Sequence, residues 1–270
     1  MQLNSLLASR FTLPSIPKVV ALLLSELERD EPDLKKITLL ISTDPALTTR
    51  LLQLSNSGFF QLSQRIHSVS ESLAVVGLGH VRTMAIASAS NASLKAVPGI
   101  NLQHYWGYSL DVAKVSRSLA GVVQQNQQAA FTAGLIHLVG ELAMRIAMPV
   151  AMARLDADIP ALDPRRAKAE RRTFGYSYAQ VGAGLARQWL FPLPIVEALE
   201  HQDAPFDEDA YEPLAGVIHL AAWRARAKDA RMNQREMAVT FPGAVGEVLA
   251  LDIDMVLQQD PIDWSMQNRG

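Results

Sequence analysis

The sequence predicts an all-α protein, and three observations lead to this prediction. Apolar residues recur mainly at spacings of three and four, which places them along one face of a helix. Helix-start signals recur along the chain, among them Asp33 before Leu34 and Asp44 before Pro45. No pair of segments combines the alternating pattern of β-strands with the turn residues of a hairpin.

The helices expected in the first hundred residues are each bounded by such signals. Pro17 opens the first helix, Asp33 and Asp44 cap the next two, and the Ser68–Glu71 segment has the spacing of a capping box. Gly77 is expected to stop the helix that begins there. The predicted ranges are 18–29, 34–42, 46–54, the segment from 68 to 77, and 80–93.

Longer helices are expected after a Pro-Gly break within 96–101. Gly140 and Pro149 are interpreted as helix stops, and the small residues Gly182, Ala183 and Gly184 are expected to permit close helix packing. The predicted ranges are 102–123, 129–139, 141–148, 163–172, 177–190, 194–201, 213–231 and 243–251, and residues 260–270 are interpreted as a tail.

Composition excludes several classes of protein. Apolar residues make up 49% of the 270 residues, which is enough to bury a core and excludes wholesale disorder. The formal charge of −2 argues against broad binding to nucleic acid, and the absence of cysteine excludes disulfides and thiolate metal sites. No apolar run approaches the length of a membrane span, and no signal peptide is visible, so a cytoplasmic location is expected.

Histidine is the most plausible metal ligand or acid–base residue in the apolar segments. His137 and His219 each lie in an apolar helical stretch, and His201 ends a short helix. Spacings of four place His137, Glu141 and Arg145 on one helix face. Two interpretations stay open for His137: a histidine at the edge of the core, hydrogen-bonded to Glu141, or a remnant metal ligand.

Charged residues cluster in the segments 163–172, 203–212 and 223–235. They are interpreted either as solvated surfaces or as parts of a docking surface for another protein. The candidate docking residues are Arg165, Arg166, Arg171, Arg172, Asp207, Glu208 and Asp209.

Three collinear stretches resemble the HDOD family, the HD-related output domain of bacterial signalling proteins. They are Leu13-Pro14-Ser15-Ile16-Pro17, the segment STDPALTTRLLQLSNS over 42–57, and the segment IHSVSESLAVVGLGHVR over 66–82. The resemblance covers roughly residues 13–228. It implies an N-terminal helical subdomain packed on an HD-domain-like helical bundle, with expected units at 1–97, 98–235 and 236–270.

The same resemblance identifies eight positions of a degenerate HD metal site. An HD hydrolase uses metal to acidify a water and to clamp a phosphoryl group. Here most of the corresponding ligands are replaced, and no metal is expected; if any binds, its ligands would be His137, His201 and His219. The eight positions are Tyr108, His137, Leu138, Tyr178, His201, Gln202, His219 and Ala222.

The function expected from the resemblance is a non-catalytic regulatory module that needs no cofactor. Its partners would be other signalling proteins acting in trans, with no membrane or nucleic-acid role. Two alternatives stay open: a metal-dependent phosphohydrolase acting on nucleotides or cyclic dinucleotides, and a receptor that binds such a ligand without chemistry.

Overall fold

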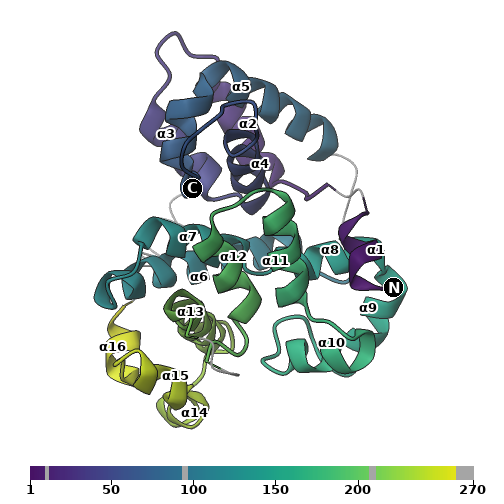
Figure 1. Cartoon of the computed structure of the whole chain (residues 1–270), viewed down its shortest axis with the longest axis vertical. Helices are drawn as coiled ribbons and strands as arrows, with labels where there is room; N and C mark the ends of the chain where they lie inside the picture. Colours follow the sequence, from purple (N-terminus) through teal and green to yellow (C-terminus); the bar gives the residue numbers. More distant parts are fainter. Residues whose placement is uncertain (10–11, 93–96, 207–210, 260–270) are drawn as a thin grey trace.

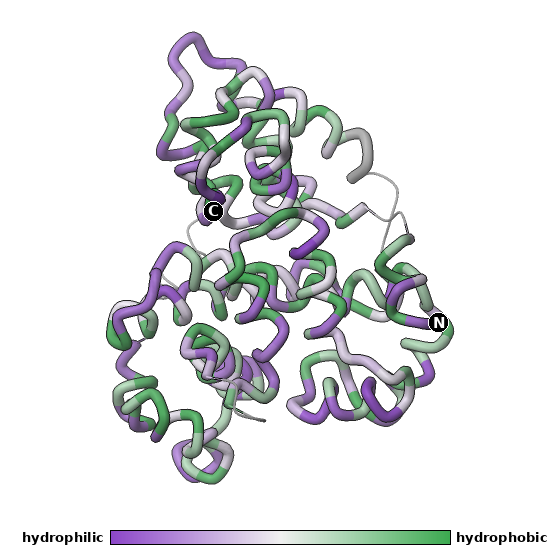
Figure 2. Tube along the Cα trace, in the orientation of Figure 1, coloured by the Kyte–Doolittle hydropathy of each residue, from purple (hydrophilic) through white to green (hydrophobic). Residues whose placement is uncertain are grey.

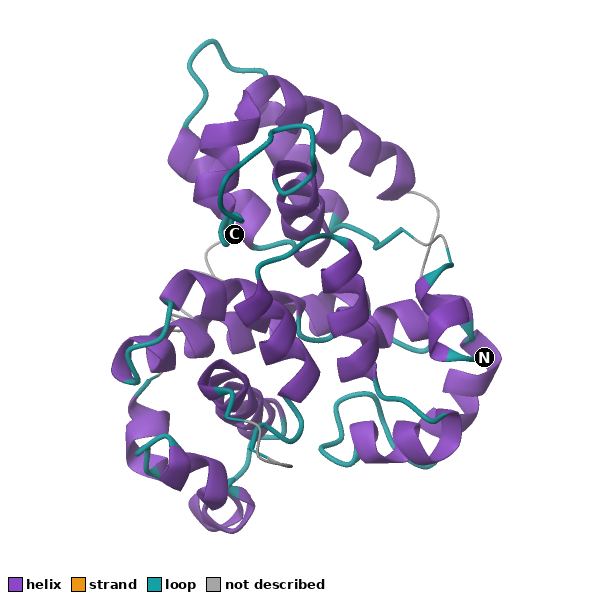
Figure 3. Ribbon diagram, viewed as in Figure 1, coloured by secondary structure: helices purple, strands orange, loops and turns teal. Residues whose placement is uncertain are grey.

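The computed structural model describes residues 1–9, 12–92, 97–206 and 211–259, and every regular element in these ranges is an α-helix (Figure 3). The predicted all-α class is therefore confirmed. The helices are α1 Leu3–Leu7, α2 Pro17–Leu27, α3 Leu34–Ser42, α4 Pro45–Ser55, α5 Val69–Ala92, α6 Leu102–Val122, α7 Gln127–Ile136, α8 Val139–Ala147, α9 Pro149–Asp156, α10 Arg166–Phe174, α11 Tyr178–Gln188, α12 Leu193–His201, α13 Pro213–Asp229, α14 Gln234–Thr240, α15 Gly243–Val248 and α16 Ile253–Gln258.

Helices α2 to α5 form the N-terminal half, at the top of Figure 1. The predicted caps are confirmed, because Asp33 accepts hydrogen bonds from the first turn of α3 and Asp44 from the first turn of α4. Gly77 interrupts α5 with a φ of 75°, a backbone conformation that glycine adopts without steric cost. The core of this half is built from Val20, Leu23, Leu27, Ile37, Ile41, Leu47, Leu51, Val69, Leu73, Val76, Val81 and Ala85.

Helices α6 to α13 form the second half, in the lower part of Figure 1. Helix α6 packs on α7 and α13, and α11 packs on α8 and α12. Figure 2 shows hydrophobic and hydrophilic residues mixed along the same helices, as amphipathic helices around a shared core require. Most of these helices contribute to one large hydrophobic cluster, which includes Tyr108, Leu138 and Ala222 of the candidate site.

The break between α7 and α8 differs from the prediction. Helix α7 ends at Ile136 and α8 begins at Val139, so the break lies at His137 and Leu138 rather than at Gly140. Gly140 lies inside α8, where an added Cβ would be 2.0 Å from the carbonyl oxygen of Tyr178. Glycine is needed there for a close approach of α8 to α11. Gly182 of α11 lies in the same contact, so the close packing predicted for these small residues is confirmed.

Several further elements differ from the prediction. The predicted stop before Pro149 is confirmed, because α8 ends at Ala147, but Pro149 also begins a new helix, α9. Helices α1, α9, α14 and α16 are absent from the predicted ranges. Helix α1 precedes the N-terminal half in sequence yet packs on α8 and α11, where Leu6 is fully buried. The unit boundaries at 97 and 235 stay predictions, and the predicted tail at 260–270 lies outside the described residues.

Two helical stretches, 69–89 and 127–147, are long and apolar enough to cross a membrane by length and composition. The sequence was expected to contain no such run. The second stretch is 89% buried within the protein and spans the break between α7 and α8. The first is interrupted at Gly77 and contributes to the core of the N-terminal half. Packing inside the protein accounts for the apolar character of the second stretch, whereas the first is 39% buried. The cytoplasmic location stays a prediction.

Candidate functional site

The break between α7 and α8 opens onto a pocket of about 210 Å³. Its walls come from α6, α11 and α13, from the turn just after α12, from the segment 161–164 that precedes α10, and from residues around α14. Seven of the eight positions identified from the sequence line it: Tyr108, His137, Leu138, Tyr178, Gln202, His219 and Ala222.

His137 is buried at the base of the pocket. Its Nδ1 donates a hydrogen bond to the carbonyl oxygen of Gly134 at 2.6 Å, and its Nε2 has no partner among the described residues. Burial lowers the pKa of His137 to about 3, so the ring is neutral at physiological pH. The expected hydrogen bond to Glu141 is wrong: the helix breaks after Ile136, and Glu141 instead accepts from Arg145 and Arg166.

His219 and Gln202 connect α13 and α12 across the pocket. Nδ1 of His219 donates to the carbonyl oxygen of Gln202 at 2.8 Å, and burial lowers the pKa of His219. The side-chain amide of Gln202 donates to the carbonyl oxygen of His137 at 3.1 Å. Gln202 therefore serves as a structural tie between α12 and the break after α7.

Tyr108 and Tyr178 fill part of the pocket with uncharged side chains. The hydroxyl of Tyr108 donates to the carbonyl oxygen of Ala222 at 3.0 Å. Burial raises the pKa of both Tyr108 and Tyr178, so both remain neutral phenols at physiological pH. A neutral phenol is a poor metal ligand, and the side chains of Leu138 and Ala222 have no ligating atom at all.

His201 is absent from the pocket lining. Its Nε2 lies 3.6 Å from a carboxylate oxygen of Glu197, one turn earlier on α12. With Glu200 these two residues form the only group of three close metal-capable side chains that the described ranges contain, and it lies outside the pocket. Of the three histidines considered as ligands, only His137 and His219 face a common space.

Arg226 is a pocket residue that the sequence analysis did not identify. Its guanidinium interacts with the hydroxyl of Tyr108 and acts on His137 and His219, where its positive charge contributes to the lowered pKa values. A signal was available, because Arg226 lies four residues after Ala222 and seven after His219 on the same helix, which is one face of α13. The sequence instead places it in the charged segment 223–235, with a solvated surface or a docking surface as the two interpretations.

Two carboxylates also line the pocket, Asp163 and Asp203. Each is bound by an arginine of the α10 region: Asp163 by Arg165 at 2.7 Å, and Asp203 by Arg171 at 2.5 Å. The pKa of Asp163 is held below its usual value mainly by its hydrogen bond from Arg165. The acidic oxygens of the pocket are therefore already paired with cations.

The candidate docking residues separate into three groups. Arg172 is exposed, and Arg165 and Arg171 are largely exposed while paired to the two aspartates. Arg166 was expected at the surface, but it is buried and bound to Glu141, Asp156 and Glu170, so it cannot belong to a docking surface. The three acidic candidates Asp207, Glu208 and Asp209 lie outside the described residues.

Burial of a neutral His137 predicts that acid destabilises the fold. The pKa of His137 is about 3 in the folded chain against 6.5 for an ordinary histidine, so between these values the unfolded chain binds the extra proton. This contribution to the free energy of unfolding is complete above pH 6.5 and is lost as the pH falls toward 3, with a limiting slope of about 1.4 kcal/mol per pH unit.

Denaturant unfolding measured between pH 7 and pH 4 tests this expectation. The variant His137→Gln should show a shallower loss of stability over this range than the unmodified protein. The matched control is His80→Gln, because His80 is exposed on α5 whereas His137 is buried. Equal slopes for all three proteins would contradict the prediction.

Comparison with known proteins agrees with this fold. The HDOD domain model matches residues 13–205. A Treponema pallidum (strain Nichols) protein of uncharacterized function is 26% identical over 229 residues, which cover 80% of this chain and 43% of that protein. The chain spans less than half the length of the curated relatives it matches.

Two crystal structures resemble the whole chain. A fragment of the MmoQ response regulator from Methylococcus capsulatus str. Bath is 26% identical with a TM-score of 0.70, covering 91% of this chain and 94% of that one. A protein from Shewanella amazonensis SB2B, provisionally named a phosphohydrolase, is 26% identical with a TM-score of 0.56, covering 95% and 92%. Because the family model spans well over half of the sequence, the chain belongs to the HDOD family.

Proposed function

We propose that this HDOD protein is a non-catalytic regulatory module that acts through contacts with other signalling proteins in trans. The observation that carries the proposal is Arg226, a fixed cation in the pocket where HD hydrolases hold metal. Two like charges repel strongly where water is scarce, so the guanidinium disfavours a divalent cation beside it. Two further features disfavour a metal ion here. Asp163 and Asp203 are already paired with arginines, and the side chains of Leu138 and Ala222 have no oxygen.

Metal content tests the non-catalytic part of this proposal. Protein purified without chelators is expected to contain far less than one ion of zinc, iron or manganese per chain. It should not hydrolyse nucleotides or cyclic dinucleotides when Mn²⁺, Fe²⁺ or Zn²⁺ is added. The proposal would be overturned if the protein holds one metal ion per chain, and if this metal is lost in His219→Gln but kept in the exposed control His80→Gln. Loss of hydrolysis together with the metal would be the strongest contrary result.

A second variant tests the role assigned to Arg226. Replacing it with glutamine removes the positive charge and keeps a polar side chain. The pKa of His219 should then rise, because part of its depression comes from this guanidinium. Titration of the His219 ring followed by NMR measures the change, and a pKa that stays the same would contradict the proposed electrostatic role.

A metal-dependent phosphohydrolase is the second candidate. It is favoured by the provisional name of the Shewanella amazonensis structure and by the presence of His137, His219, Asp163 and Asp203 around one pocket. The metal and hydrolysis measurements above decide between the two candidates. A ligand receptor at this pocket is a weaker candidate, since about 210 Å³ is below the volume of most small-molecule sites.

The partner surface that we propose is the exposed part of the α10 region. Arg165 and Arg172 are exposed and can be reversed to glutamate without touching the buried Arg166. If this surface docks acidic proteins, the double reversal should abolish binding to a co-purified signalling partner while the melting temperature stays unchanged. Unchanged binding would remove this surface from the proposal.

A further inference from the structure

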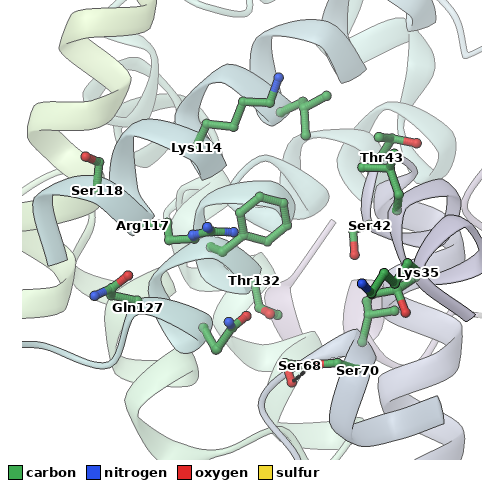
Figure 4. A pocket seen from close by; sticks show the side chains of 16 residues that line it. Lys35, Ser42, Thr43, Ser68, Ser70, Lys114, Arg117, Ser118, Gln127 and Thr132 are labelled. Carbon is green, nitrogen blue, oxygen red and sulfur yellow. Dashed lines mark hydrogen bonds between the residues drawn. The ribbon is translucent and has the colours of Figure 1, made fainter. Parts of the chain in front are cut away.

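A larger cleft of about 680 Å³ lies where the N-terminal half meets the bundle (Figure 4). One wall comes from α3, the turn after it and the start of α5, and the other comes from α6 and α7. Its volume is within the range of sites that enclose nucleotide-sized molecules. None of its lining residues belongs to the pocket around His137.

The charge of this cleft is all of one sign. Lys35 of α3 lies across the cleft from Lys114 and Arg117 of α6, as Figure 4 shows, and the lining includes no aspartate or glutamate. None of the three cations forms an ion pair within the described ranges, whereas the neighbouring Lys36 binds Glu26 at 2.6 Å. Unpaired cations that face a shared space create a positive potential and attract an anion.

The rest of the lining suits an organic anion better than an inorganic ion. The lining includes Ser42, Ser70 and Gln127, whose hydroxyl and amide groups can hydrogen-bond to phosphate oxygens. Leu39 on one wall and Phe131 on the other add apolar surface, and Leu39 is 64% exposed although it lies on a helix with a well-buried face. A base ring bound between the walls would cover apolar surface of Leu39 that is otherwise in water.

We propose that the cleft binds a nucleotide-class ligand, with its phosphates between Lys35, Lys114 and Arg117 and its base against Leu39 and Phe131. The ligand would contact both halves of the protein at once, because the two walls come from different halves. Binding would stabilise one relative placement of the halves, which gives a regulatory module a chemical input. This inference does not depend on the pocket around Arg226.

Isothermal titration calorimetry on the full chain tests the proposal. The probes are ATP, GTP, cyclic di-GMP and inorganic pyrophosphate, each at concentrations up to about 1 mM. The test variant is Lys114→Gln with Arg117→Gln. Its matched control is Lys168→Gln with Arg172→Gln, which removes the same charge from exposed positions of α10. Circular dichroism and melting temperature check that both double variants are folded.

At least one nucleotide should bind the unmodified protein, with an affinity that falls as salt is raised. The cleft variant should weaken this binding by about tenfold or more, and the α10 control should change it by less than about twofold. Leu39→Gln should weaken the nucleotide and leave any pyrophosphate binding unchanged.

Four results would overturn the proposal. The first is that none of the three nucleotides binds, and the second is that the cleft variant and the α10 control bind equally well. The third is that pyrophosphate binds as tightly as the best nucleotide. The fourth is that nucleotide binding survives in the cleft variant but is lost in Arg226→Gln. The last result would place the ligand in the smaller pocket.

Discussion

Gly140→Ala is expected to lower the free energy of unfolding by about 3 kcal/mol or more. The new methyl group would lie 2.0 Å from the carbonyl oxygen of Tyr178 and 2.6 Å from the backbone nitrogen of Gly182. Both contacts are with backbone of α11, which cannot rotate away as a side chain can. Alanine improves helix propensity by at most about 1 kcal/mol, so the clash decides the sign.

Two glycine variants serve as controls for this result. Gly182→Ala lies across the same contact, but its methyl group would be 3.6 Å from the nearest atom, an ordinary contact distance. Gly107→Ala on α6 meets no atom within 4 Å and should stabilise the protein by about 0.5–1 kcal/mol. Urea unfolding measures all three. A loss for Gly140→Ala no larger than that for Gly182→Ala would contradict the close contact of α8 and α11.

Local signals predicted most of the fold. The helix caps at Asp33 and Asp44 could be predicted because each aspartate accepts hydrogen bonds from backbone N–H groups only two or three residues further along the chain. Gly140 shows the limit of such reasoning: a glycine near a helix boundary is typical of a stop, but here a contact with α11, some forty residues away, requires it. Propensity does not report which helix will pack against which.

The candidate site was predicted in part for the same reason. Its seven lining positions followed from the family pattern, which orders them along the chain. The pattern could not show that His201 lies outside the pocket, since His201 is adjacent in sequence to Gln202, which does line it. Nor could it show the pairing of Asp203 with Arg171, because ion pairs between distant segments leave no periodic signal.

Arg166 illustrates this limit most clearly, and it lies at the centre of a buried ionic network. Its Nε donates to Glu170 at 2.9 Å, its Nη2 to Glu141 at 3.0 Å, and its Nη1 to Asp156 at 2.8 Å. Arg145 binds Glu141 and, with two hydrogen bonds of 2.7 Å, Asp156. Burial and the neighbouring Glu141 raise the pKa of Glu170, so Glu170 holds a proton and is neutral. The network then contains two positive charges, on Arg145 and Arg166, and two negative charges, on Glu141 and Asp156.

Arg166→Met is therefore expected to lower the free energy of unfolding by about 3–5 kcal/mol, because it leaves Glu141 and Asp156 with Arg145 as their one remaining arginine partner. Glu170→Gln should cost far less, since it replaces a group that already carries a proton at neutral pH with a neutral one of the same shape. Arg165→Met, one residue earlier but exposed, is the matched control and should change stability by less than about 1 kcal/mol. Denaturant unfolding at pH 7 ranks the three variants. A loss for Glu170→Gln as large as that for Arg166→Met would show that Glu170 is ionised and that the network holds an excess negative charge.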